Sequence, residues 1–262
     1  MTTVIKSRTR QQLQYCIAFI AALMLSSCST VPTTTHLEPA APPQATSPCN
    51  IEPTPNEPHF IIGYGSLMQT QSRRRTVPNA TTVYPIALRG YQRGWYIKGV
   101  PFGFSTTFLG ITPKPKAQLN GVLYQVNHNE LLDTDKRESG YCRHKVATSD
   151  IDVLAGDPSL TESSHIWVYA SHPGKTTVPS PRFPIVQSYV DIFVSGCMEL
   201  ETQYQLTGFA KRCITSTHDW STHWVNDRLH PRRPFIFQPK SIKIDKLLKG
   251  TVPQQFDSIT IE

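Results

Sequence analysis

A change of pattern late in the chain constrains the fold most strongly. Before it, a series of short segments has the β-branched and aromatic composition of strands: residues 59–64, 83–89, 94–98, 105–111, 119–126, 141–147 and 165–170. From Ile185 to Cys197, apolar side chains recur at steps of three and four residues, which predicts a helix that starts at Pro184. Because strands come first and helices last, we predict an α+β fold and not repeated β-α-β units.

Connections between these segments follow from glycine, proline and charge. Residues 89–94 (RGYQRG) predict a turn between two strands, and a Pro- and Lys-rich turn follows residue 111. The charged segment 129–137 (NELLDTDKR) predicts a short surface helix. Residues 203–215 predict a second helix after the one that starts at Pro184.

The first residues have the organisation of a secretion signal. Basic residues, among them Lys6, precede an apolar run from Cys16 to Leu25. At about 1.5 Å per residue, this run falls far short of a bilayer core of roughly 30 Å, so it is not a membrane span. A basic start and a short apolar run instead predict a signal peptide.

The end of that run is similar to the lipobox of bacterial lipoproteins. Leu25, two serines and Cys28 follow one another, and in a lipobox the cysteine is acylated and becomes the new N-terminus. We therefore expect residues 1–27 to be a lipoprotein signal peptide and Cys28 to anchor the chain to the membrane. The residue after Cys28 is Ser29 and not an aspartate. By resemblance to Gram-negative lipoproteins, this predicts anchoring to the outer membrane on its periplasmic side. The alternative is an ordinary signal peptide that ends near a cysteine.

The remaining chain divides into a tether and a domain. Residues 28–58 are rich in Pro, Thr, Ala and Ser, a composition that predicts a flexible tether. Residues 59–262 are enough for one domain with a sizeable core. Without the signal, 23 Lys and Arg face 19 Asp and Glu. This modest excess, and a basic run at residues 72–75 that is too short, argue against a nucleic-acid partner.

Four cysteines remain in the mature chain: Cys49, Cys142, Cys197 and Cys213. Their spacing is not that of a zinc site, so we expect no metal. Export permits disulfides, and four cysteines allow three complete pairings. A bridge from Cys49 would pin the tether, and Cys197 can meet Cys213 across a helical hairpin. Buried reduced thiols are the alternative.

Two motifs carry candidate chemistry. The first is Gly63-Tyr64-Gly65-Ser66-Leu67 after the first strand. Its glycines allow a tight turn whose backbone N–H groups can hold a carboxylate or an oxyanion. A simple turn is the alternative.

The second motif is the helix end at Glu138. Asp135 and Glu138 lie three residues apart and share a helix face. The helix dipole would raise the pKa of a carboxylate at this end, which suits general acid–base catalysis. A solvated helix end is the alternative.

The order of these motifs resembles the γ-glutamylcyclotransferase-like family. A YGSL turn, a strand NGVLYQV (residues 120–126), a helix LLDTDKRE (residues 131–138) and Tyr141-x-Arg143 follow one another. Further segments resemble a bacterial and plant branch of this family: Ser72, Arg73 and Thr76, and residues 90–95 (GYQRGW). Two later blocks, residues 184–196 and 220–231, resemble the C-terminal extension of that branch.

The resemblance implies a fold and a reaction. The fold is a small mixed β-barrel of the γ-glutamylcyclotransferase-like type with flanking and C-terminal helices. The reaction cyclises a γ-glutamyl amine or peptide to 5-oxoproline and a free amine, without a cofactor. By resemblance, Tyr64, Gly65, Ser66 and Leu67 bind the glutamyl head, and Glu138 is the catalytic acid and base. An enzyme for γ-D-glutamyl cell-wall fragments and a non-catalytic envelope lipoprotein are the alternatives.

Overall fold

A computed structural model describes residues 49, 51–99, 105–172, 176–233 and 240–262. The predicted signal peptide, Cys28 and most of the predicted tether lie outside these ranges. The described residues belong to one unit that begins at Thr46. In the part of the chain that is described, no helix has the length and apolar character that a membrane crossing requires.

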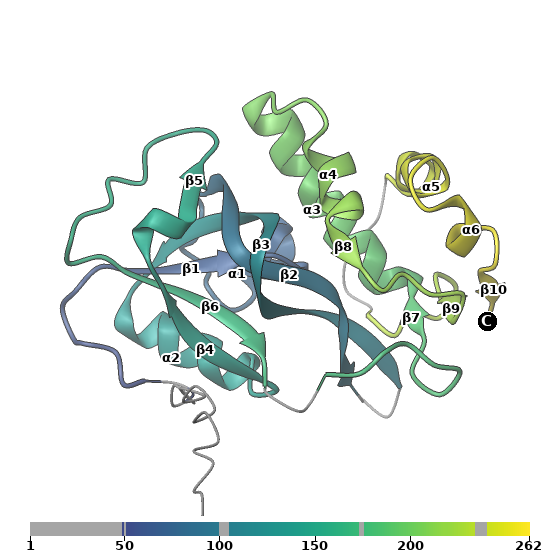
Figure 1. Ribbon diagram of the computed structural model, residues 1–262, viewed down its shortest axis with the longest axis horizontal. Helices are drawn as coiled ribbons and strands as arrows, with labels where there is room; N and C mark the ends of the chain where they lie inside the picture. Colours follow the sequence, from purple (N-terminus) through teal and green to yellow (C-terminus); the bar gives the residue numbers. More distant parts are fainter. Residues whose placement is uncertain (1–48, 50, 100–104, 173–175, 234–239) are drawn as a thin grey trace, which may run out of the picture. The chain divides into compact units, whose positions relative to one another are not determined.

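The centre of the domain is a curled mixed sheet (Figure 1). Its strands among the described residues are β1 (His59–Gly63), β2 (Tyr84–Gly99), β3 (Thr106–Val126), β4 (Tyr141–Val146), β5 (Ile151–Val153), β6 (His165–Ser171) and β8 (Thr217–His218). They follow the order β4-β6-β1-β3-β2-β5, and β8 also pairs with β2. β1 runs antiparallel to β3 and parallel to β6. The α+β prediction is confirmed, with the sheet curled into a half-barrel.

Helices flank this sheet and follow it. Those in the described ranges are η1 (Ser66–Met68), α1 (Thr70–Arg74), α2 (His128–Arg137), η3 (Thr148–Asp150), α3 (Gln187–Tyr204), α4 (Phe209–Thr215), α5 (Ser241–Lys249) and α6 (Pro253–Phe256). A small second sheet, of order β10-β9-β7, joins β7 (Ile185–Val186), β9 (Trp224–Asn226) and β10 (Thr260–Ile261). Buried apolar residues of α3 and α4 share one core with the sheet.

The surface helix is confirmed as α2. It begins at His128, one residue before the predicted start, because Asn127 caps it. The Asn127 side chain accepts a hydrogen bond from the Glu130 N–H, and the Glu130 carboxylate accepts one from the Asn127 N–H. This reciprocal capping box fixes where α2 begins, and therefore where its other end places Glu138.

The predicted turn at residues 89–94 is wrong, because β2 continues through it. Gly90 has a φ of +82° and forms a bulge between Arg89, which pairs with Gln118, and Tyr91, which pairs with Pro113. Opposite this bulge, residues 114–117 of β3, which are rich in Pro and Lys, have no paired residue in β2. A glycine at positive φ absorbs the bend without ending the strand.

The start of the long helix is also corrected. Ile185 and Val186 form β7, which pairs with Trp224 and Val225 of β9, and α3 begins only at Gln187. The second helix is shorter than residues 203–215, because α3 itself runs to Tyr204 and α4 begins at Phe209. The partner strand of β7 lies far along the chain, so local periodicity could not reveal it.

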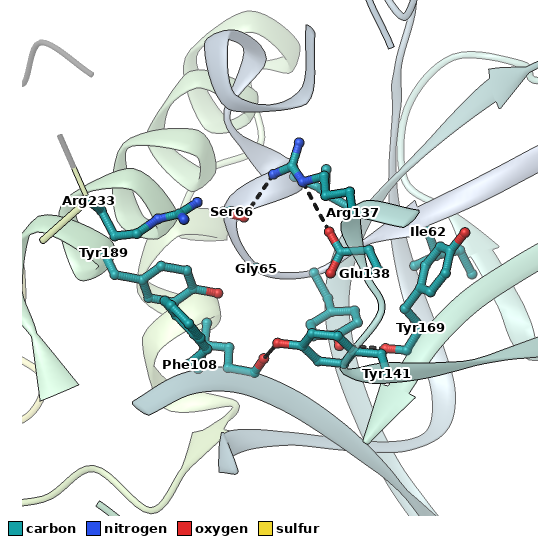
Figure 2. A pocket seen from close by; sticks show the side chains of 13 residues that line it. Ile62, Gly65, Ser66, Phe108, Arg137, Glu138, Tyr141, Tyr169, Tyr189 and Arg233 are labelled. Atoms are coloured by element: carbon teal, nitrogen blue, oxygen red, sulfur yellow. Dashed lines mark hydrogen bonds and ion pairs between the residues drawn. The ribbon is translucent and has the colours of Figure 1, made fainter. Parts of the chain in front are cut away.

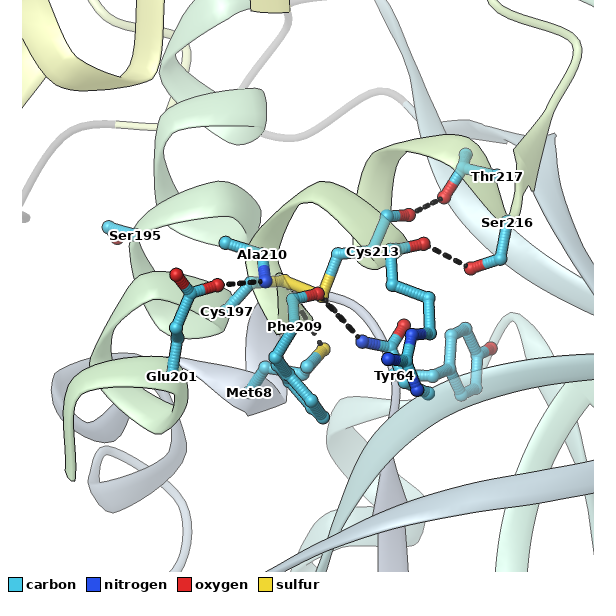
Figure 3. The surroundings of a disulfide bond; sticks show 12 residues. Tyr64, Met68, Ser195, Cys197, Glu201, Phe209, Ala210, Cys213, Ser216 and Thr217 are labelled. Carbon is cyan, nitrogen blue, oxygen red and sulfur yellow. Dashed lines mark hydrogen bonds between the residues drawn. A yellow bond between two sulfur atoms is a disulfide. The ribbon is translucent and has the colours of Figure 1, made fainter. Parts of the chain in front are cut away.

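The four cysteines form two disulfides, Cys49–Cys142 and Cys197–Cys213. The first joins the end of the predicted tether to β4, with its Cα atoms 4.8 Å apart. The second joins α3 to α4 beside Met68 (Figure 3), whose sulfur lies 3.8 Å from that of Cys197. The N-terminal approach and the helical hairpin are thus both covalently tied.

A buried arginine connects the sheet to the C-terminal helices. Arg93 of β2 is 0 % exposed. Its guanidinium donates to the carbonyl oxygens of Tyr64 (3.0 Å), Asn120 (2.9 Å) and Cys213 (2.7 Å). It also donates to the side chain of Asn120 and to the hydroxyls of Ser216 and Thr217. Burial lowers its pKa to about 9, a cost that these hydrogen bonds offset.

We expect Arg93→Met to lower the free energy of unfolding by at least about 3 kcal/mol, since it strands several buried carbonyl oxygens. Denaturant unfolding under oxidising conditions measures this loss. Arg89→Met on the same strand is the control: Arg89 is 44 % exposed and pairs with Asp152, a surface pair worth about 0–1 kcal/mol. Equal losses in the two variants would contradict the role given to Arg93.

Candidate active site

A cavity of about 160 Å³ opens where β1 ends (Figure 2). Its walls come from the turn after β1, the end of α2, strands β1, β3, β4 and β6, helix α3 and the segment after β9. The lining residues are Ile62, Tyr64, Gly65, Ser66, Leu67, Phe108, Leu109, Arg137, Glu138, Tyr141, Tyr169, Tyr189 and Arg233. All five residues predicted from the two motifs therefore line one cavity.

The turn Gly63–Leu67 forms one side of the cavity. After Gly65 the chain enters η1, and Met68 N–H donates to the Gly65 carbonyl at 3.1 Å. A Cβ on Gly65 would lie 2.9 Å from the hydroxyl of Tyr189. A larger residue at this position would push against the Tyr189 hydroxyl, so glycine suits this close approach of the turn to α3.

Buried groups hold this turn in place from behind. Arg73 is 1 % exposed and donates to the carbonyls of Leu67 and Met68, both at 3.1 Å. The hydroxyl of Tyr64 donates to the carbonyl of Tyr169 at 2.5 Å, and Arg93 binds the Tyr64 carbonyl. The part of the family motif that contains Arg73 thus supports the turn.

Glu138 lies opposite the turn, directly after the last residue of α2. Its side chain is 16 % exposed, and its carboxylate pairs with the Nε of Arg137 at 3.2 Å. The remaining nitrogens of Arg137 donate to Ser72 O (3.0 Å) and Thr76 Oγ1 (2.8 Å), and more weakly to the hydroxyls of Ser66 and Ser72. Arg137 therefore fixes Glu138 relative to both α1 and the turn.

Burial raises the pKa of Glu138, and the positive charges of Arg137 and Arg233 oppose this rise. The direction agrees with the prediction, but the largest cause is burial and not the helix dipole. A carboxyl group with a raised pKa can accept and return a proton closer to neutral pH than an exposed one. The geometry thus presents one proton-transfer group facing a backbone turn.

Tyrosines form much of the remaining wall. Burial raises the pKa of Tyr189 to about 12 and that of Tyr141 well above its ordinary value. The Tyr141 hydroxyl donates to the Leu109 carbonyl at 2.8 Å. Tyr141 therefore lines the cavity with its hydroxyl bound to the backbone of β3.

Arg143 and Asp135 lie outside the lining of this cavity. Arg143 is 1 % exposed, pairs with Asp135 at 3.1 Å and stacks on Trp167 at 4.5 Å. Asp135 also accepts a hydrogen bond from the Tyr169 hydroxyl at 2.7 Å. Arg143 therefore pairs with an acidic residue of the domain outside the cavity lining.

The motifs missed several lining residues. Arg137 lies inside the second motif, but nothing in the sequence separates it from its charged neighbours. Tyr189 belongs to the apolar stripe of α3 and looks like a core residue. Arg233 follows the block 220–231, for which the resemblance implied no site residue. Within the described ranges, no group of three or more His, Cys, Asp or Glu is placed to hold a metal ion.

Fold and site together define a pocket on a curled α+β half-barrel. Residues 61–184 match the family described as gamma-glutamyl cyclotransferase, AIG2-like. This part of the chain is therefore similar to the γ-glutamyl cyclotransferase-like family. The match includes Tyr64–Leu67 and Glu138, whereas Tyr189 and Arg233 lie beyond it.

Solved structures with low sequence identity are also similar. A structure described as a gamma-glutamyl cyclotransferase is 15 % identical, with 74 % of this chain and 100 % of that chain covered and a TM-score of 0.47. An uncharacterised human protein is 15 % identical, with 73 % of this chain and 98 % of that chain covered and a TM-score of 0.46. A yeast γ-glutamyl cyclotransferase described as specific to glutathione is 12 % identical, with 62 % of this chain and 98 % of that chain covered and a TM-score of 0.39. No curated protein matches the chain.

The raised pKa of Glu138 predicts a pH dependence of stability. Its stabilising contribution is fully present below the ordinary pKa of 4.5 and is lost as the pH rises through the raised pKa, because the folded protein holds this proton more tightly than the unfolded chain. Glu138→Gln keeps the shape and removes the titration. We therefore expect urea unfolding to show the variant gaining stability relative to wild type as the pH rises from 4.5 toward neutral.

Asp133→Asn is the control for this measurement, since Asp133 lies on the exposed side of the same helix. Its difference from wild type should change little over the same pH range. A Glu138→Gln difference that is also independent of pH would contradict the raised pKa.

Proposed function

We propose that the domain cyclises a γ-glutamyl substrate to 5-oxoproline and releases a free amine. The observation that carries this proposal is the cavity in which Glu138, with its raised pKa, faces the turn Tyr64–Leu67. The family match of residues 61–184 supports it.

In this reaction the α-amine of the substrate attacks its own γ-carbonyl carbon. An ammonium group has no lone pair, so a base must first remove a proton, and Glu138 takes it. The new C–N bond closes the five-membered ring while the bond to the leaving nitrogen breaks. Glu138, now protonated, returns the proton to that nitrogen. The ring nitrogen still carries one proton more than the product lactam; this second proton also passes through Glu138 to the released amine, which leaves as an ammonium, so the enzyme ends the cycle unchanged.

The other residues position these groups. The backbone N–H groups of the turn can bind the carboxylate of the glutamyl head. Arg137 keeps the Glu138 carboxylate in place through Ser72 and Thr76. Because the attack is intramolecular, a fixed substrate conformation supplies much of the rate acceleration.

The first test is release of 5-oxoproline by the mature chain, with γ-glutamyl amino acids, glutathione and γ-D-glutamyl dipeptides as substrates. We expect Glu138→Gln to reduce kcat by at least about a hundredfold, since it removes the proton-transfer group. Asp133→Asn, which removes a carboxylate from the exposed side of α2, should retain activity.

The outcomes separate the alternatives. Turnover of γ-D-glutamyl dipeptides alone would redirect the proposal to cell-wall fragments with a free α-amine. No release from any substrate by a folded protein would contradict the cyclotransferase proposal and favour a binding lipoprotein.

We also propose that the protein is a lipoprotein of the cell envelope, anchored through Cys28. The support is the sequence Leu25–Cys28 after a short apolar run, together with two disulfides that suit an oxidising compartment. The membrane is then a partner of the acylated N-terminus, with the domain on the periplasmic side.

Cys28→Ser should abolish incorporation of labelled palmitate and release the protein from the membrane fraction, because the acylated thiol is lost. Cys16→Ser, inside the apolar run, should leave both unchanged. Labelling that persists in Cys28→Ser would contradict the anchor.

A further inference from the structure

Arg233 brings a charge into the cavity from outside the family match. It follows β9, and its side chain points toward the cavity beside Tyr189 (Figure 2). Its Cζ lies 5.6 Å from the centre of the Phe108 ring. Among the described residues, its guanidinium has no hydrogen-bond or ion-pair partner.

Arg137, the other cation of the cavity lining, already uses its hydrogen-bond donors on neighbouring residues. Its nitrogens bind Glu138, Ser66, Ser72 and Thr76, so it balances the charge of Glu138 and has no donor to spare. Arg233 therefore leaves the cavity with an uncompensated positive charge. A partly buried guanidinium without an anion is costly, and burial lowers its pKa. A bound carboxylate would remove that cost.

The backbone that carries Arg233 is fixed to α3. Asp227 is 1 % exposed and accepts hydrogen bonds from the N–H (2.7 Å) and the hydroxyl (2.6 Å) of Ser188. It also accepts one from the N–H of Arg232 at 2.7 Å. The Ser188 hydroxyl in turn accepts a hydrogen bond from the Arg233 N–H at 3.1 Å. Arg233 is thus held at the start of the helix that supplies Tyr189.

The proposed reaction assigns one carboxylate of the substrate to the turn, beside Glu138. Arg233 approaches the cavity from the side of Tyr189, across from Glu138 (Figure 2). A γ-glutamyl amino acid has a second carboxylate, on the carbon attached to the leaving nitrogen. Its two carboxylates and one ammonium give a net negative charge that matches the charge left by Arg233.

We propose that Arg233 binds a carboxylate on the leaving side of the substrate and so determines specificity for γ-glutamyl amino acids over uncharged γ-glutamyl amines. This inference rests on the proposed cyclotransferase function. It assigns the choice of leaving group to a residue that lies C-terminal to the family match, and proton transfer to the residues inside that match.

The test compares γ-glutamylalanine with γ-glutamylethylamine, which differ mainly by this carboxylate. For Arg233→Met we expect kcat/KM to fall roughly ten- to a hundredfold with γ-glutamylalanine and to stay within about threefold with γ-glutamylethylamine, the range expected for a hydrogen-bonded charge pair. Arg233→Lys should lose less than Arg233→Met. Arg212→Met, which removes an exposed arginine of α4, should change neither value.

Equal losses with both substrates would overturn the inference, because Arg233 would then act on the glutamyl head or on the fold. Unchanged activity of Arg233→Met would overturn it as well. If wild type turns over neither substrate, the proposed reaction fails separately. Calorimetric binding of both compounds to Glu138→Gln, with and without Arg233→Met, then decides the carboxylate contact: weaker binding confined to γ-glutamylalanine supports it, and any other pattern overturns it.

Discussion

The rest of the structure depends on the hydrogen bonds that the buried guanidinium of Arg93 donates. Every hydrogen bond that it donates within the described residues ends on an uncharged oxygen, and these oxygens belong to the glycine turn, to β3, to the end of α4 and to β8. A planar group with several fixed donors can satisfy such dispersed acceptors at once. Its ring contact with Phe193, 4.8 Å from the centroid, adds α3 to the same centre.

This connection makes the C-terminal helices part of the site. α3 packs so closely on the turn that a Cβ on Gly196 would lie 2.4 Å from the backbone nitrogen of Gln69. The Cys197–Cys213 disulfide closes the same helices beside Met68 (Figure 3). The turn is therefore held between the sheet, Arg73 and α3. This rigidity suits a reaction whose rate depends on positioning.

The sequence predicted the features that depend on neighbouring residues and missed those that depend on pairing between distant segments. The turn Tyr64–Leu67 and Glu138 stand in contiguous motifs, so the sequence could propose them, and α2 carries its own capping signal at Asn127. Residues 89–94 misled because glycine permits a turn and a bulge equally well, and only pairing with β3 decides between them. β7 was missed since its partner, Trp224, lies far along the chain.

The sequence by itself determined the α+β class, the candidate turn, the candidate carboxylate and the signal-like N-terminus, because periodicity, composition and short motifs are properties of neighbouring residues. Only the tertiary structure decided the disulfide pairing, the burial that raises the pKa of Glu138, and the arrival of Tyr189 and Arg233 in the cavity. Burial and electrostatic balance arise when distant segments pack together and exclude water, and no local pattern in the chain encodes which segments will meet.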